Sequence, residues 1–433
     1  MVKFPTDLVI AICIHGIDGI QESVNLFKSF VGKNYVLHLN FFYKEWERVW
    51  IQSSSKIRMK DLMSFYKILK PEQQLDFIKK NINRIEDIHI NNDSIFYKVC
   101  KSNNCEVLKY LIKYAISINS PINIHKDDEY IFCVACRNGK LDIVKYLIEY
   151  TNSIYSPIDI RVNYEYIFSV ACRNAKLDVV RFLIEYTNSK HSQIDIHIFD
   201  ENPFFFACHN GKLDIVKYLI GYTNSINSPI NIHAGNEKAF GRACHNGKLD
   251  MVKYLIEYTV SINSPINIHA DNEKAFYNAC CSGNLDIVKY LIGYTNSINS
   301  PINIHADNEK AFHEICCNGK LDIVKYLIGY TNSINTPINI HIDNEKAFRD
   351  TCYSGNLDIV KYLIEYTNSI NSPININMPS DFDFLRVCKN GHYEVIKFIC
   401  KHYVIPPRFI CNGINATKNN KIKNFLTEHL LCV

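Results

Sequence analysis

The sequence predicts an all-α solenoid of helix-turn-helix units, joined by short hairpin-like loops and repeating every 36 residues. Three observations lead to this fold class. A cysteine recurs at a fixed spacing, each copy carries two apolar stripes of helical period, and Asn-Gly and Ser-Pro pairs separate these stripes in the best-preserved copies. Self-similarity at a fixed period of this length is typical of stacked repeats. The recurring cysteines are Cys100, Cys136, Cys172, Cys208, Cys244, Cys280, Cys316, Cys352 and Cys388.

The first helix of a unit is predicted from the copy around Cys244. Phe240, Ala243 and Cys244 stand at positions i, i+3 and i+4, which share one face of a helix. Asn246-Gly247 follows, and glycine supplies the positive φ with which helices commonly end. We therefore expect a short helix that packs through this stripe and ends in a tight turn.

A second amphipathic helix follows the tight turn. Its apolar stripe comprises Leu249, Val252, Leu255 and Ile256. Ser264-Pro265 ends any continuation, because proline disfavours helix in the residue before it. Residues 266–269 then alternate apolar and polar like a short extended segment, and Asp271-Asn272 is a turn pair.

This order of elements resembles the ankyrin repeat. Ala243-Cys244 stands where that family has paired alanines, Asn246-Gly247 where it has its inter-helix glycine, and residues 249–256 where it has its second helix. Asp271-Asn272 falls at the family's hairpin tip. In two departures, Lys238-Ala239-Phe240 replaces the usual Thr-Pro-Leu-His opening, and each unit exceeds the common length of about 33 residues by three.

The resemblance implies a helical array whose first helices line a concave groove that contacts partner proteins. The Asn, Ile, Lys and Tyr content of the repeats also resembles that of ankyrin repeat proteins of giant amoeba-infecting viruses of the mimivirus type.

The repeat frame divides the chain into parts. Residues 1–57 do not repeat, and Phe4-Pro5 with Leu8 resembles the opening of an F-box; a plain helical capping segment is the alternative. Residues 58–90 are expected to be a degenerate N-terminal capping repeat, and residues 411–433 a C-terminal cap with a closing helix over 421–431. Nine ankyrin-type repeats are expected over residues 91–410, namely 91–126, 127–162, 163–198, 199–234, 235–270, 271–306, 307–342, 343–378 and 379–410.

Composition excludes several classes of protein. A formal charge of only +4 is too small for a dedicated nucleic-acid binder. There is no apolar run of about eighteen residues to span a membrane, and no secretory signal is evident. Most of the 17 cysteines belong to the repeat, which favours free thiols in a reducing compartment. We therefore expect a monomer in the cytoplasm, the host cytoplasm if the chain is viral.

The recurring cysteines and histidines are expected to be structural. Each cysteine replaces a small buried alanine, and Cys133-x-x-Cys136 has no second pair to complete a zinc site. The histidines are expected to be loop residues that bond neighbouring backbone; they are His125, His197, His233, His269, His305 and His341. No phosphate-binding glycine loop or nucleophile elbow is present, and His313-Glu314 lacks the second histidine of a zinc-protease motif. The sequence predicts no enzyme, no cofactor and no metal site.

Differences between the copies point to a binding surface. The second helix hardly varies, and the Lys253 position changes only to arginine. The first helix varies three residues before, two residues before and one residue after its cysteine, positions that share one face. We interpret this face as a partner-binding surface rather than as neutral drift. Its candidate residues are Phe205, Phe206, His209, Arg242, His245, Tyr277, Asn278, His313, Glu314, Arg349, Asp350 and Tyr353.

Three functions fit these observations. The first is a non-catalytic scaffold that binds a partner protein in the concave groove. The second is a substrate adaptor of a ubiquitin ligase, recruited through the F-box-like residues 1–57. The third is an RNA-binding helical repeat protein, which the low charge and the few aromatic side chains at the variable positions disfavour.

Overall fold

The computed structural model describes residues 71–84, 90–102, 104–158, 164–174, 176–190, 194–375 and 381–432. The F-box-like segment expected at residues 1–57 lies outside them. The chain divides into two compact units, Met1–Asp195 and Ile196–Val433, each of which is described by itself. In the described ranges helices are the only regular secondary structure, which confirms the predicted all-α class.

Helices of the first compact unit follow one another in pairs after α5. They are α5 (Pro71–Asn81), the 3₁₀ turn η2 (Ile82–Arg84), α6 (Ile90–Ser102), α7 (Cys105–Ser117), α8 (Lys126–Arg137), α9 (Leu141–Ser153), α10 (Tyr164–Asn174) and α11 (Leu177–Ser189). In each pair the even-numbered helix is the first helix of a repeat and the odd-numbered helix is the second.

The second compact unit continues this pattern and closes with two further helices. Its elements are α12 (Ile198–His209), α13 (Leu213–Ser225), α14 (Ala234–His245), α15 (Leu249–Ser261), α16 (Ala270–Ser282), α17 (Leu285–Ser297), α18 (Ala306–Cys317), α19 (Leu321–Ser333), α20 (Ile342–Ser354), α21 (Leu357–Ser369), α22 (Asp381–Asn390), α23 (Tyr393–His402), α24 (Pro407–Ala416) and α25 (Asn420–Cys432). The closing helix expected over 421–431 is α25, and α24 runs across the boundary expected at 410/411.

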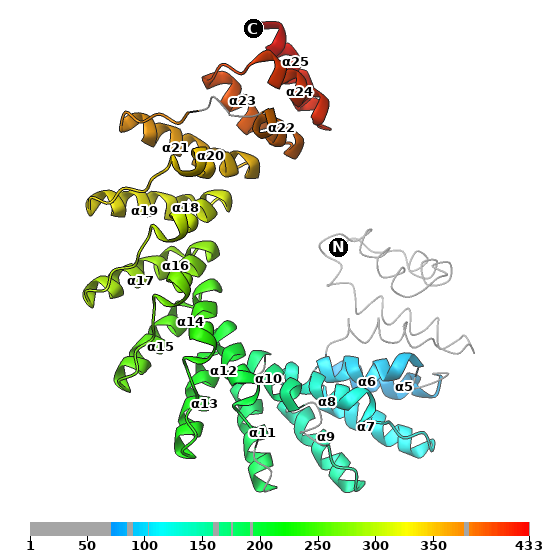
Figure 1. Ribbon diagram of the computed structural model, residues 1–433. Coiled ribbons are helices and arrows are strands. Elements are labelled where there is room, and N and C mark those ends of the chain that lie inside the picture. The colour runs from blue at the N-terminus through cyan, green and yellow to red at the C-terminus, as the bar shows by residue number, and fades with distance from the viewer. Residues whose placement is uncertain are drawn as a thin grey trace, which may run out of the picture. The chain divides into compact units, whose positions relative to one another are not determined.

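Within the second unit each helix pair stacks on the next (Figure 1). First helices pack against first helices, as α14 does against α16, and second helices contact second helices, as α15 does α17. Each repeat therefore presents one edge of its first helix to the neighbouring repeat. Stability in such arrays comes largely from these nearest-neighbour interfaces.

The core of a repeat lies between its two helices and follows the predicted stripes. Phe240, Ala243 and Cys244 are fully buried. The recurring cysteines are buried and free in the described residues, and burial raises the pKa of the Cys244 thiol. On the second helix the prediction was wrong at Leu249, which is only half-buried; Met251 is buried in its place because Leu249 is the first residue of α15.

The turn between the two helices needs its glycine. Gly247 has φ +68°, and the Lys248 amide donates to the Ala243 carbonyl at 3.0 Å. A Cβ on Gly247 would lie 3.1 Å from Nδ2 of Asn284 in the next repeat. Glycine at this position therefore suits both the backbone conformation and the close approach of the neighbour.

The tip before each first helix is a left-handed turn in the best-preserved repeats. Asp271 and Asn272, the predicted turn pair, have φ of 50° and 56°, and Glu273 continues the turn with φ of 64°. Before the tip, Ile266 and Ile268 are buried and Asn267 between them is exposed, so the predicted alternation is present although no strand forms. Non-glycine residues in this conformation cost roughly 1–2 kcal/mol each, so contacts elsewhere must hold the tip in place.

Candidate protein-binding surface

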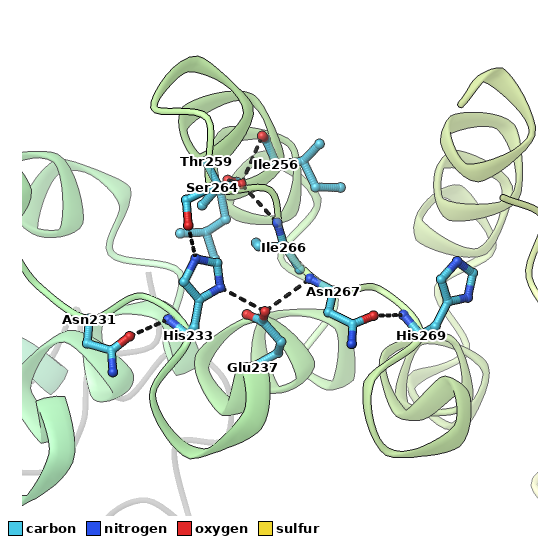
Figure 2. A network of polar contacts seen from close by, with 10 residues as sticks. Asn231, His233, Glu237, Ile256, Thr259, Ser264, Ile266, Asn267 and His269 are labelled. Carbon is cyan, nitrogen blue, oxygen red and sulfur yellow. Dashed lines mark hydrogen bonds and ion pairs between the residues drawn. The ribbon is translucent and has the colours of Figure 1, made fainter. Parts of the chain in front are cut away.

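A polar network around a buried glutamate holds the tip (Figure 2). Glu237 is only 7% exposed, and its Oε1 accepts a hydrogen bond from His233 Nδ1 at 2.8 Å. The same oxygen accepts from the Asn267 backbone amide at 3.0 Å. His233 Nε2 is hydrogen-bonded to Ser264 Oγ at 3.0 Å. Because Ser264 and Asn267 lie in the loop that leads to α16, the network joins one repeat to the next.

This His–Glu–Ser network recurs along the second compact unit. Glu201, Glu273, Glu309 and Glu345 each accept from the histidine four residues earlier and from the backbone amide 30 residues later. Expecting the histidines to bond neighbouring backbone was therefore wrong for their rings: each ring bonds its glutamate, and every ring except that of His305 also bonds a serine hydroxyl. The reason is the left-handed tip, which brings the glutamate carboxylate within hydrogen-bond distance of the histidine Nδ1. On the second helix, the Thr259 hydroxyl donates to the Leu255 carbonyl at 2.8 Å.

The second helices also join neighbouring repeats through their constant residues. Lys253 Nζ lies 5.6 Å from the centroid of the Tyr290 ring in the next repeat, a cation–π distance. Equivalent contacts join Lys217 to Tyr254 and Lys289 to Tyr326. The constancy of this lysine therefore has a structural cause. The constancy alone does not indicate whether the second helices bind a partner.

The twelve candidate binding residues differ in their access to solvent. Arg242 is exposed, and Phe205, Phe206, His209, His245, Tyr277, Glu314, Arg349 and Asp350 are partly exposed. Three are buried, namely Asn278, His313 and Tyr353. The three variable positions thus lie on one face of the first helix, which we call the first-helix face. Not every side chain on this face reaches solvent.

The buried members of this set face neighbouring first helices. Asn278 Nδ2 donates to the Gly241 carbonyl of the preceding repeat at 3.0 Å. The Tyr353 ring is covered by the Arg386 guanidinium, whose carbon lies 4.6 Å from the ring centroid. Burial lowers the pKa of His313, and the Lys346 charge lowers it further. These residues support repeat packing, and a partner would reach them only at their edges.

Five of the twelve candidates line one cleft of about 530 Å³ in the second compact unit. They are Arg242, His245, Tyr277, Asn278 and Glu314. The cleft extends over the tips and first helices α14 and α16 and reaches α18. The residues outside it are Phe205, Phe206, His209, His313, Arg349, Asp350 and Tyr353.

Two glycines open this cleft. Gly241 stands where the flanking repeats have Phe205 and Tyr277, and a Cβ there would meet Asn278 Nδ2 at 3.3 Å. Gly235 stands at the tip where the three following repeats have aspartate, and it also lines the cleft. The absence of two side chains therefore places the hollow at this repeat.

Sequence comparison of the repeats missed most of the lining residues, among them Gly235, Lys238 and Lys274. Lys238 and Lys274 also line the cleft, and they were overlooked because they recur at an apparently invariant tip position. Gly235 could have been found, since the following repeats carry Asp271, Asp307 and Asp343 at its position.

Regular helix pairs stacked through nearest-neighbour contacts define the class of helical repeat proteins. Overlapping stretches of the sequence match the family described as "Ankyrin repeats (3 copies)", over residues 67–163, 135–230, 168–266, 226–301, 243–339, 276–374 and 312–408. The chain belongs to the ankyrin repeat family, whose repeats are in general protein–protein interaction modules. A comparison with curated proteins finds no match.

Metal sites and membrane-spanning helices are absent from the described ranges. In the described residues no group of three or more His, Cys, Asp or Glu side chains is placed to hold a metal ion. Over the same ranges, every helix is too short or too polar to span a membrane.

Proposed function

We propose that the chain is a non-catalytic scaffold that holds a partner protein against the first-helix face. One observation carries this proposal: five of the twelve variable residues line one open cleft, while the constant Lys253 of the second helix contacts the next repeat. The exposed Arg242 and the Tyr277 ring are residue types that dominate binding energy at protein interfaces.

The sequence also suggests the partner and the compartment of this scaffold. The repeat composition resembles that of giant amoeba-infecting viruses, and the free buried thiols favour a reducing compartment. We propose a host protein as the partner and the host cytoplasm as the location.

The experiment is affinity capture from host-cell lysate with the full chain, followed by calorimetry with the captured partner. Alanine at both Arg242 and Tyr277 should weaken binding by about 2 kcal/mol or more. The matched control changes Glu257 to alanine and Val260 to asparagine on α15, where neighbouring repeats have Gly and Asn. Weaker binding by the control with normal binding by the cleft variant would place the interface on the second helices instead.

Residues 1–57 carry a separate proposal, recruitment of a ubiquitin-ligase component. It depends on Phe4, Pro5 and Leu8, which resemble an F-box opening. Ligase components that co-purify with the chain should be lost when Pro5 and Leu8 are both alanine. Their retention would leave the solenoid as a scaffold without an adaptor role.

A further inference from the structure

The cleft contains a guanidinium that pairs with no side chain in the part of the chain that the structure describes. Arg242 is exposed and, among the residues that the structure describes, its guanidinium forms no hydrogen bond or ion pair, although its backbone carbonyl accepts from Asn246. The carboxylates of the cleft all accept hydrogen bonds already. Glu237 accepts from His233 and Asn267, Asp271 from Asn236, and Glu314 from Asn318 at 2.9 Å. The guanidinium is therefore the group with most unused hydrogen-bonding capacity, since it has five donors.

Two lysines beside Arg242 also lack a counter-ion within the described residues. Lys238 Nζ lies 4.7 Å from the Phe205 ring centroid, and Lys274 Nζ lies 4.8 Å from that of Tyr277. These contacts hold the ammonium groups near the cleft and leave their charge available to a ligand.

One of the following repeats shows how a tip can neutralise its lysine. Lys310 forms an ion pair with Asp307 of its own tip at 3.7 Å. At the position equivalent to Asp307 the cleft repeat has Gly235, so Lys238 has no such partner in its own tip. A carboxylate supplied from outside would give Lys238 the kind of pairing that Lys310 has with Asp307.

We propose that the cleft binds the carboxylate of an aspartate or glutamate side chain in an acidic peptide segment of the partner protein. Arg242 binds this carboxylate through two parallel hydrogen bonds, the bidentate geometry that guanidinium and carboxylate groups form. Lys238 and Lys274 add charge from either side, and the Tyr277 ring packs against the aliphatic part of the acidic side chain. This assignment rests on the proposed scaffold function and specifies the chemistry of its ligand.

A peptide fits the cleft better than a nucleic acid does. Asp271 and Glu314 line the cleft, and the Asp200 carboxylate lies 3.5 Å from the position of a Cβ on Gly235. A phosphodiester chain has a charge at every nucleotide and would meet these carboxylates along the array. A single acidic side chain between uncharged residues can reach Arg242 without meeting them.

The test is selection of a random dodecapeptide phage-display library on the immobilised full chain. Synthetic versions of the selected peptides are then measured with four proteins: the wild type, Arg242→Gln, Asp200→Asn and Lys418→Gln. Lys418→Gln is the matched control, because it removes one positive charge at an exposed loop position outside the cleft. Circular dichroism verifies that each variant is folded.

Selected peptides should share an aspartate or glutamate, and its replacement by Asn or Gln should weaken binding about tenfold. Arg242→Gln should cause a similar loss, Asp200→Asn should strengthen binding, and Lys418→Gln should change nothing. Selection that yields no Arg242-dependent peptide, or peptides without an acidic residue, would overturn the proposal. Binding of single-stranded RNA at the cleft in place of peptides would also overturn it. The scaffold function is tested separately, by whether the captured partner requires Arg242 and Tyr277.

Discussion

Replacing Glu237 with alanine should weaken the junction between α14 and the loop that leads to α16. The substitution removes the oxygen that accepts from His233 Nδ1 and from the Asn267 amide. His233 is 34% exposed and can turn to water, whereas the Asn267 amide lies in the partly buried inter-repeat contact. Leaving one such donor unsatisfied costs roughly 1–3 kcal/mol, so we expect about 2 kcal/mol of lost stability.

Glutamine at the same position separates hydrogen bonding from charge. Its amide oxygen still accepts from both donors, while its NH₂ group replaces Oε2, which is buried and has no hydrogen-bond partner within the described ranges. We expect Glu237→Gln to cost about 1 kcal/mol, less than alanine, because only the neutral amide group is newly unsatisfied. Lys238→Ala, on the same tip and exposed, is the matched control and should change stability by less than about 0.5 kcal/mol.

The measurement combines urea denaturation, followed by circular dichroism, with hydrogen exchange at the Asn267 amide. Exchange is included because long repeat arrays can unfold in parts, so that one global free energy is not well defined. Faster exchange at Asn267 in the alanine variant would locate the loss at the junction. An alanine variant that matches the control in both measurements would refute the coupling role of Glu237.

Substitutions at three further sites test the core, the turn and a buried histidine. Cys244→Ala should cost less than about 1 kcal/mol in urea denaturation, while Cys244→Asp, which buries a charge, should cost about 3 kcal/mol or more; equal stability of the two would contradict a core position. Gly247→Ala should cost about 1–2 kcal/mol in thermal denaturation because of its φ of +68° and the nearby Asn284. Burial lowers the pKa of His313 below its usual 6.5, so the unfolded chain takes up the proton first and stability should fall as pH drops below that value. His313→Gln should lessen this fall between about pH 7.5 and about pH 5.5, and an identical pH profile would exclude the histidine as its source.

The repeat period and the core could be predicted from sequence because both depend on local spacing. Phe240, Ala243 and Cys244 lie in one copy of the period, and a helical repeat of apolar residues determines which face is buried. The left-handed tip at Asp271-Asn272 was predictable for the same reason, since these residue types tolerate positive φ.

Features between repeats could not be predicted in the same way. The burial of Asn278 and His313 depends on how closely neighbouring first helices approach, which no single copy specifies. The role of Glu237 depends on a bond to a residue 30 positions later. The recurrence of a glutamate four residues after each tip histidine was visible in the sequence, but its meaning required the left-handed turn.

The His–Glu–Ser network also bears on how such an array can change length. The five repeats whose tip histidines are His197, His233, His269, His305 and His341 carry both halves of the junction: the histidine and glutamate at the tip, and the asparagine with a serine or threonine in the loop. Any of these repeats can therefore adjoin any other without compensating substitutions. Duplication or loss of a 36-residue segment would preserve every junction, while Gly235, Gly241 and Arg242 would move as a block. Recombination could in this way lengthen the array or relocate its cleft, and the chemistry of binding would evolve independently of the means by which the chain folds.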